Sequence, residues 1–321
     1  MIEPVRLGIL GGSAMIARRS VLPAVAASAR VELVASASRS DLHPEGVPQR
    51  FTSYDDLLAC DDVEAVYVPL PNGLHEQWVT AAAAAGKHVL CEKPLAITAD
   101  AAERMARACE DAGVLLMEAY MTPFHPRTRT MFDLLRGGRL GTLHHVHTHF
   151  SWELSDQGDH RVDADLGGGS LLDLGIYCLE PILLGGGWQA GDPLPEIAAR
   201  ADWRAPGVDL TTTGWLALPS GVSGSFMTSF DAPHEQRIEL LGSRAAARIA
   251  TMAYTGDVDA TAIDVSDRAG VETIHSSTGA QYQLMVEHFC DVLRGRAELE
   301  RPPARSVALA RVIDRIREIA A

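Results

Sequence analysis

The sequence predicts an α/β protein in which an N-terminal doubly wound parallel sheet precedes a C-terminal α+β domain, built on a large, mostly antiparallel open sheet. Over about the first 120 residues, short β-branched apolar segments alternate with helical ones, which is the pattern of a parallel sheet. Beyond Pro123 the apolar residues recur with period two, as in antiparallel strands. With 321 residues, 47% of them hydrophobic, the chain can fill two cores. We therefore place the domains at residues 1–122 and 123–321.

The first strand, residues 5–10, runs into a turn of small residues and then into a helix that reaches about Ala29. Gly12-x-Ala14-x-x-Ala17 keeps the spacing of a dinucleotide-binding turn, with alanine in place of the second glycine. Backbone amides of a first helical turn point at a phosphate, and small residues let it approach. We expect a pyrophosphate to be bound here, and an ordinary tight turn is the alternative. The predicted contacts are Gly12, Ser13, Ala14, Met15 and Ile16.

The second strand, residues 31–37, ends in Ser38 and Arg39, with no acidic residue between positions 36 and 40. In dinucleotide folds this end meets the adenosine ribose, where an acid binds the 2′-hydroxyl of NAD. A hydroxyl with an arginine suits the 2′-phosphate of NADP instead. We predict NADP as the cofactor, with NAD possible, and a solvated surface arginine as the alternative reading of Arg39.

Two further strands, residues 64–68 and 88–91, flank an alanine-rich helix over residues 74–85 that ends at Gly86. Ligands of an open α/β sheet bind outside the carboxyl ends of its strands. Polar side chains follow both strands there, so we expect cofactor contacts and a lysine at one rim. The predicted rim consists of Pro69, Leu70, Asn72 and His75 after the first strand, and Glu92 and Lys93 after the second.

The remaining helices and strands are predicted from helix-capping residues and from the spacing of apolar residues. Ser53 and Thr98 precede helices in capping positions, and residues 114–117 form a fifth apolar strand. After a connecting helix at residues 124–135, alternating strands cover 143–152, 210–218, 221–230, 237–241 and 245–251. Helices at 281–294 and 303–320 close the chain.

Three histidines of one strand, His145, His147 and His149, share a face at steps of about 6.5–7 Å. That spacing is too wide for one tetrahedral zinc ion, so we predict no metal. A polar sheet face or an oligomer contact is the expected role.

The tract from residue 163 to 177 contains three consecutive glycines before a helix, which allow a close approach of backbone to another group. Asp173 and Tyr177 are four residues apart, so a helix places them on one face. A carboxylate and a phenol together can bind a hydroxyl or carbonyl and move a proton. The alternative is an ordinary buried pair. His125 and Arg161 complete the predicted substrate rim.

Composition argues against several classes of partner and against a disulfide-rich protein. The net charge of −14 disfavours nucleic acid and anionic membranes, because phosphate binding needs clustered bases. Five widely spaced cysteines without a C-x-x-C pair argue against a disulfide framework. The sequence shows neither a signal peptide nor a run of about 20 apolar residues, so we expect a cytoplasmic protein.

Three motifs together resemble the glucose–fructose oxidoreductase / inositol dehydrogenase / MocA (Gfo/Idh/MocA) family of NAD(P)-dependent oxidoreductases. They are Glu-Lys-Pro at Lys93, Pro-Leu-Pro-Asn-x-x-His ending at His75, and Gly-Gly-Gly-x-Leu-x-Asp-x-Gly-x-Tyr ending at Tyr177. Phe124-His125-Pro126 and the helix over 282–289 are similar as well, so the resemblance covers essentially the whole chain. The glycine turn departs from the family pattern, being one residue longer at Gly11.

The resemblance implies an N-terminal Rossmann domain that binds NAD(P) and a C-terminal domain whose large open sheet is often used for oligomerisation. We expect this second domain to bind the substrate, and the chain to form a homodimer or, as a second choice, a homotetramer. The resemblance also implies that Lys93 contacts nicotinamide and substrate, and that Asp173 holds a substrate hydroxyl. Tyr177 stands where many members carry histidine, and a nearby ammonium would lower the pKa of a phenol toward neutrality. We therefore predict Lys93, Tyr177 and Asp173 as catalytic residues.

The predicted function is NADP-dependent hydride transfer between nicotinamide and a hydroxyl or carbonyl of a sugar or sugar derivative. The rim offers donors and acceptors as a polyhydroxylated ring requires, and Arg161 is its one arginine, which argues against multiply charged acids. The alternatives are a nucleotide-sugar 3-ketoreductase, a trans-dihydrodiol dehydrogenase and a non-catalytic dinucleotide-binding regulator.

Overall fold

The computed structural model describes residues 3–40, 42–156, 158–256 and 258–321. The chain divides into two compact units, Met1–Met121 with Tyr282–Val307 and Thr122–Gln281 with Ala308–Ala321. Each unit contains its own sheet. Within the described ranges, no helix has both the length and the apolar character that a membrane span needs.

The first unit is built on a parallel sheet of six strands in the order β3-β2-β1-β4-β5-β6. All five strand pairs are parallel, which confirms the predicted doubly wound sheet. The strand order reverses between β1 and β4, so the carboxyl ends of these two strands meet at the switch point. One strand, β3, was not predicted. The strands are β1 (Val5–Leu10), β2 (Val31–Ala37), β3 (Gln49–Phe51), β4 (Ala65–Val68), β5 (His88–Glu92) and β6 (Leu116–Ala119).

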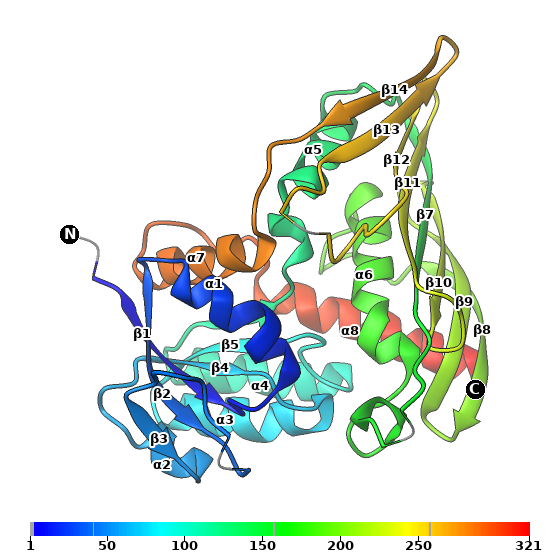
Figure 1. Cartoon of the computed structure of the whole chain (residues 1–321). Helices are drawn as coiled ribbons and strands as arrows, with labels where there is room; N and C mark the ends of the chain where they lie inside the picture. The colour runs from blue at the N-terminus through cyan, green and yellow to red at the C-terminus, as the bar shows by residue number, and fades with distance from the viewer. Residues whose placement is uncertain (1–2, 41, 157, 257) are drawn as a thin grey trace. The chain divides into compact units, whose positions relative to one another are not determined.

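Helices cover both faces of this sheet. Figure 1 shows α1 and α7 on one face and α3 and α4 on the other. Both predicted caps are confirmed, because Ser53 accepts a hydrogen bond from the amide of Asp56, and Thr98 from that of Ala101. The elements are η1 (Ala17–Val21), α1 (Leu22–Ala26), α2 (Tyr54–Leu58), η2 (Asn72–Leu74), α3 (His75–Ala84), α4 (Ala99–Asp111) and α7 (Gln281–Leu293).

The second unit is built on a sheet of eight strands in the order β14-β13-β12-β11-β7-β10-β9-β8. Among the described strands of this sheet, only β7 and β10 pair in parallel, so the predicted mostly antiparallel sheet is confirmed. Three strands, β8, β13 and β14, were not predicted. The strands are β7 (Leu143–Ser151), β8 (Glu196–Ala205), β9 (Val208–Ala217), β10 (Ser223–Ser229), β11 (Glu235–Gly242), β12 (Ala246–Ile249), β13 (Ala262–Asp267) and β14 (Gly270–His275).

One face of the large sheet is packed against helices. The helix α6 (Ser170–Gly185) lies on β7, β9 and β10, with η3 (Thr122–Phe124), α5 (Pro126–Arg136) and η4 (His160–Val162) elsewhere in the unit. The part of α8 (Pro303–Ala320) from Ala308 onward lies on the same side as α6 (Figure 1). Gly224 of β10 has no room for a side chain because Ile182 of α6 packs directly on it. No described helix of this unit covers the opposite face of the sheet.

Candidate active site

The glycine turn after β1 is held closed by its own backbone. The amides of Gly11 and Gly12 both donate to the carbonyl oxygen of Ala37, at 2.9 and 3.1 Å. Gly11 has φ +103°, and a side chain there would lie 2.9 Å from Leu70. Leu70, which packs on the turn from the loop after β4, therefore explains why the extra residue is a glycine. The predicted pyrophosphate contacts of residues 12–16 stay a prediction.

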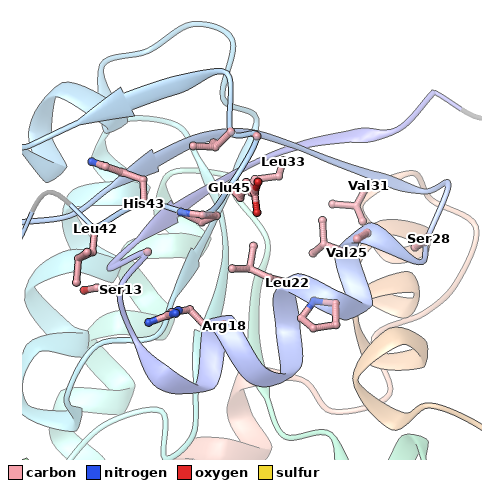
Figure 2. Close-up of a pocket in the computed structure, with 16 residues that line it drawn as sticks. Ser13, Arg18, Leu22, Val25, Ser28, Val31, Leu33, Leu42, His43 and Glu45 are labelled. Carbon is pink, nitrogen blue, oxygen red and sulfur yellow. The ribbon is translucent and has the colours of Figure 1, made fainter.

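A groove of about 710 Å³ extends from this turn, within the first unit. Figure 2 shows its two walls: η1 and α1 supply Arg18 and Leu22, and the loop after β2 supplies Leu42 and His43. Neither Arg18 nor His43 was among the predicted site residues. The groove is lined by Gly12, Ser13, Arg18, Leu22, Pro23, Val25, Ala26, Ser28, Val31, Leu33, Leu42, His43, Pro44, Glu45, Gly46 and Val47.

The end of β2 joins the glycine turn through hydroxyl groups. Ser38 is 1% exposed, and its Oγ lies 3.4 Å from Ser13 Oγ and 3.1 Å from Ser40 Oγ. Arg39 is exposed beside it. Hydroxyls and a guanidinium, with no acidic residue between positions 36 and 40, are the donor set that a ribose 2′-phosphate needs. The residues present therefore fit NADP.

The predicted rim residues after β4 and β5 come together around His75. The ring is 0% exposed, with Nε2 2.8 Å from the carbonyl oxygen of Leu70. Its Nδ1 lies 2.9 Å from the carbonyl oxygen of Pro94 and 3.2 Å from that of Leu95. Burial is the main influence on this imidazole and lowers its pKa. His75 thus lies between the two loops, inside the unit. Of the other predicted residues, Pro69 is buried and Asn72 opens η2.

Glu92 and Lys93 form the start of the second loop. The Tyr67 hydroxyl donates to Glu92 Oε1 at 2.6 Å, and the Lys93 amide donates to Glu92 Oε2 at 3.2 Å. Burial and the neighbouring Glu92 carboxylate raise the pKa of Tyr67. Glu92 is therefore engaged with Tyr67 and with the Lys93 backbone. Lys93 itself is half-buried, and its peptide bond to Pro94 is cis.

In the second unit, the triple glycine is explained by the start of α6. A side chain at Gly168 would lie 2.5 Å from the carbonyl oxygen of Arg161. Gly169 has φ +105°, and a side chain there would collide with Asp209 Oδ1. Asp209 lies on β9 and accepts from Ser170 Oγ at 2.6 Å and from the Leu171 amide at 3.0 Å. The close approach predicted for the glycines is thus to Asp209 and Arg161, and it sets where α6 begins.

The helix α6 presents Asp173 and Tyr177 from successive turns. Asp173 Oδ2 accepts from Arg161 Nε at 2.9 Å, and Arg161 Nη1 lies 3.2 Å from both carboxylate oxygens of Asp159. The attraction of Asp173 raises the pKa of Arg161. The guanidinium lies 5.6 Å from the ring centre of Trp152. Two of the predicted substrate-binding residues, Arg161 and Asp173, are therefore brought into direct contact.

Tyr177 is fixed by aromatic packing. Its ring packs edge-on against Phe150 at 5.2 Å and tilted against Tyr254 at 5.5 Å, and the residue is 4% exposed. Such contacts hold a ring in one orientation. His125, the remaining predicted substrate residue, is buried, and its Nδ1 accepts from the Arg127 amide at 3.1 Å as the N-cap of α5. Its contact with a substrate stays a prediction.

Three histidines of β7 contact hydroxyl groups of neighbouring residues, among them His149, whose Nε2 lies 2.9 Å from Ser151 Oγ. His145 contacts Ser223 at 2.8 Å and Ser225 at 2.9 Å, and His147 contacts Ser225 at 2.9 Å. Burial lowers the pKa of His145, His147 and His149, so these rings are neutral at neutral pH. In the part of the chain that the structure describes, no group of three or more histidine, cysteine or acidic residues could hold a metal ion.

Two sequence profiles match the chain. Residues 5–120 match the oxidoreductase family with an NAD-binding Rossmann fold, and residues 128–248 match the GFO/IDH/MocA C-terminal domain. D-xylose 1-dehydrogenase (NADP(+)) 2 from Haloferax volcanii is 39% identical over 327 residues, which cover 98% of this chain and 96% of that protein.

A second relative is the dTDP-3,4-didehydro-2,6-dideoxy-alpha-D-glucose 3-reductase from Actinomadura kijaniata. It is 42% identical over 246 residues, which cover 75% of this chain and 73% of the reductase. Among solved structures, a 3-ketoreductase from Actinomadura kijaniata in complex with NADP and TDP-benzene superposes with a TM-score of 0.90 at 30% identity. The match covers 99% of this chain and 98% of that one.

Proposed function

Because this chain belongs to the GFO/IDH/MocA family of NAD(P)-dependent oxidoreductases, we propose that it transfers a hydride between NADP and a sugar or sugar derivative. The hydride moves to or from a carbon that bears a hydroxyl or carbonyl group. The observation that carries the substrate class is the polar cluster at α6, where Arg161 of η4 holds Asp173 one turn before Tyr177. A carboxylate held in this way accepts hydrogen bonds from hydroxyl groups, which a sugar has on adjacent carbons.

NADP, when bound, supplies or accepts the hydride, and the chain supplies orientation and a proton. In the proposed reaction Tyr177 exchanges the proton of the reacting oxygen at its phenol Oη. Asp173 accepts a hydrogen bond from a substrate hydroxyl, and Lys93 donates to the reacting oxygen. The positive charge of Lys93 beside that oxygen stabilises the negative charge that develops on the oxygen during hydride transfer. Arg161 orients the Asp173 carboxylate, and His125 lines the substrate site.

The cofactor preference can be tested at the end of β2. We expect Arg39→Ala to weaken NADPH binding by about 10- to 150-fold and to leave NADH binding nearly unchanged, because one charge-assisted contact with the 2′-phosphate is lost. Fluorescence titration with both cofactors measures this. Arg107→Ala, which removes another exposed arginine that pairs with Glu103 on α4, is the matched control. Equal affinity of the unmodified protein for NADH and NADPH would contradict the preference.

Activity assays with a panel of sugars test the substrate class. We expect NADP reduction with one or more free aldoses and NADPH oxidation with the corresponding keto-sugars or lactones. A site that hydrogen-bonds hydroxyls rejects analogues that lack them by about 10⁴-fold or more, so deoxy analogues are the matched controls. Activity confined to a non-sugar carbonyl or an imine would overturn the proposal.

A nucleotide-sugar 3-ketoreductase is the second candidate, supported by the relatives from Actinomadura kijaniata. The same panel separates the two, because a ketoreductase of that kind would act on dTDP-linked keto-sugars and not on free aldoses. Adding an aromatic trans-dihydrodiol to the panel tests the dihydrodiol dehydrogenase alternative, which predicts NADP reduction with that compound. Absence of turnover with tight NADPH binding would favour a non-catalytic regulator.

We expect the chain to assemble as a homodimer, or second as a homotetramer, through the helix-free face of its large sheet. That face carries neutral His145 and His147 and the side chain of Trp215, which is 42% exposed. A broad sheet face with an exposed tryptophan gains stability when a second copy covers it. Light scattering at micromolar concentration should give a multiple of the 34.4 kDa chain mass, and Trp215→Glu should shift it toward the monomer. A monomeric unmodified protein would count against this.

A further inference from the structure

The turn that carries Lys93 is anchored to buried carboxylates through its amides. The Lys93 amide donates to Glu92 Oε2 at 3.2 Å, and the Leu95 amide donates to Glu118 Oε1 at 2.7 Å. Glu118 is in turn held by the Ser306 hydroxyl at 2.6 Å and by Arg301. All of these groups belong to the first unit. The turn therefore takes its shape from the interior of that unit.

The carbonyl side of the same turn is held by His75. Its Nδ1 faces the carbonyl oxygens of Pro94 and Leu95 at 2.9 and 3.2 Å, and its Nε2 faces that of Leu70 at 2.8 Å. His75 is the first residue of α3 and is fully buried, so its ring has a rigid support. It thus lies between the loop after β4 and the Lys93 turn.

A neutral imidazole has a single N–H, so it can donate to only one of these loops. The other ring nitrogen then turns a lone pair toward a carbonyl oxygen. Two carbonyl dipoles converge on Nδ1 and one on Nε2, so the proton is more stable on Nδ1. Burial lowers the pKa of His75, which favours the neutral ring. The proton therefore belongs on the side of the Lys93 turn.

We propose that His75 is a positioning residue for the reaction, whose Nδ1–H holds the Pro94–Leu95 backbone and thereby fixes Lys93. The inference rests on the proposed function, in which Lys93 takes part in hydride transfer. It assigns His75 the role of holding the turn that carries Lys93. This role replaces the direct cofactor contact that was predicted from the position of His75 in the sequence. Since a displacement of about 1 Å in a reacting group can cost about 100-fold in rate, a loosened turn should lower kcat markedly.

A double-mutant cycle tests whether His75 acts through Lys93. We expect His75→Leu to lower kcat by about 10- to 100-fold while the Kd for NADPH changes by less than about threefold. In a Lys93→Met background the same substitution should have almost no further effect, because the group that it positions is gone. Equal losses in the two backgrounds would overturn the inference. If Lys93→Met alone kept normal turnover, the proposed function of Lys93 would fail instead.

Two conservative variants of His75 test the same proposal without relying on the double-mutant cycle. They also do not depend on whether His75→Leu folds normally. The amide of asparagine can donate near the position of Nδ1, whereas the longer glutamine donates near the position of Nε2. We therefore expect His75→Asn to restore most of kcat and His75→Gln to restore little. Glutamine equal to or better than asparagine would overturn the inference.

His88→Leu is the matched control. His88, at the start of β5, accepts from the Leu115 amide at 2.8 Å, so its loss costs a comparable hydrogen bond far from the carboxyl ends of the strands. We expect a lower Tm with unchanged kcat. A loss of kcat equal to that of His75→Leu would show that the His75 effect is general destabilisation.

Discussion

Tyr177→Phe should lower kcat by about 100- to 10,000-fold, because the proposed proton exchange at the phenol Oη is removed while the ring is kept. The edge-on packing against Phe150 and the tilted packing against Tyr254 involve only the ring, so α6 should keep its position. NADPH binding should be nearly unchanged. Steady-state kinetics with the best substrate of the panel, together with a cofactor titration, measures both quantities.

Tyr254→Phe is the matched control. It removes a hydroxyl that donates to the Arg237 carbonyl at 2.8 Å, from a ring in contact with Tyr177. Its expected effect is a loss of about 0.5–1.5 kcal/mol of unfolding free energy with near-normal kcat. Near-normal turnover of Tyr177→Phe would remove Tyr177 from the mechanism.

Lys93→Met should cost about 100- to 10,000-fold in kcat, because the thioether chain has a similar length but has neither a proton to donate nor a charge to place beside the reacting oxygen. The loop itself should persist, since its known anchors are the Lys93 amide and the backbone of the next two residues. Single-turnover measurements with saturating NADPH separate this loss from a change in cofactor affinity.

The sequence contains one other lysine, Lys87, so the same substitution at that residue is the matched control for Lys93→Met. Lys87 is buried, and its Nζ donates to the carbonyl oxygens of Cys60 and Val63 at 2.9 and 2.8 Å. We expect Lys87→Met to lower Tm and to leave kcat unchanged. A Lys93→Met enzyme with full turnover would mean that this ammonium has no part in catalysis.

Most of the fold could be predicted because the signals were local. Buried parallel strands stand out as short apolar runs, and the Ser53 and Thr98 caps mark helix starts. Two of the missed strands, β3 and β14, lack such signals, whereas β13 has only a short alternation with buried Ile263 and Val265. β3 has only three residues, and every residue of β14 is at least partly exposed, so neither carries a buried apolar pattern. In β8, alanines alternate with charged residues only over residues 199–202, and the strand is an edge strand held by its pairing with β9.

The candidate site could be predicted only in part, because only its local patterns can be read from the sequence. The i, i+4 pair on α6 and the polar residues after β4 and β5 are visible in the sequence. Asp209 is not, because it reaches the start of α6 from a strand about 40 residues later. The same holds for Glu118, which anchors the Leu95 amide from β6. A sequence motif shows which side chains stand together along the chain, but not which distant group completes their hydrogen bonds.

The inward anchoring of the Lys93 turn has a consequence for the evolution of new specificities. Glu92, His75 and Glu118 are buried, and their hydrogen bonds described above run to the turn and to the interior of the first unit. Asp173 and Tyr177, the residues proposed to meet the substrate, stand on a helix of the second unit. Substitutions that change the accepted sugar can therefore accumulate around α6 without loosening the lysine. A directed-evolution library for a new substrate should be confined to the second unit, with the first left unmutated.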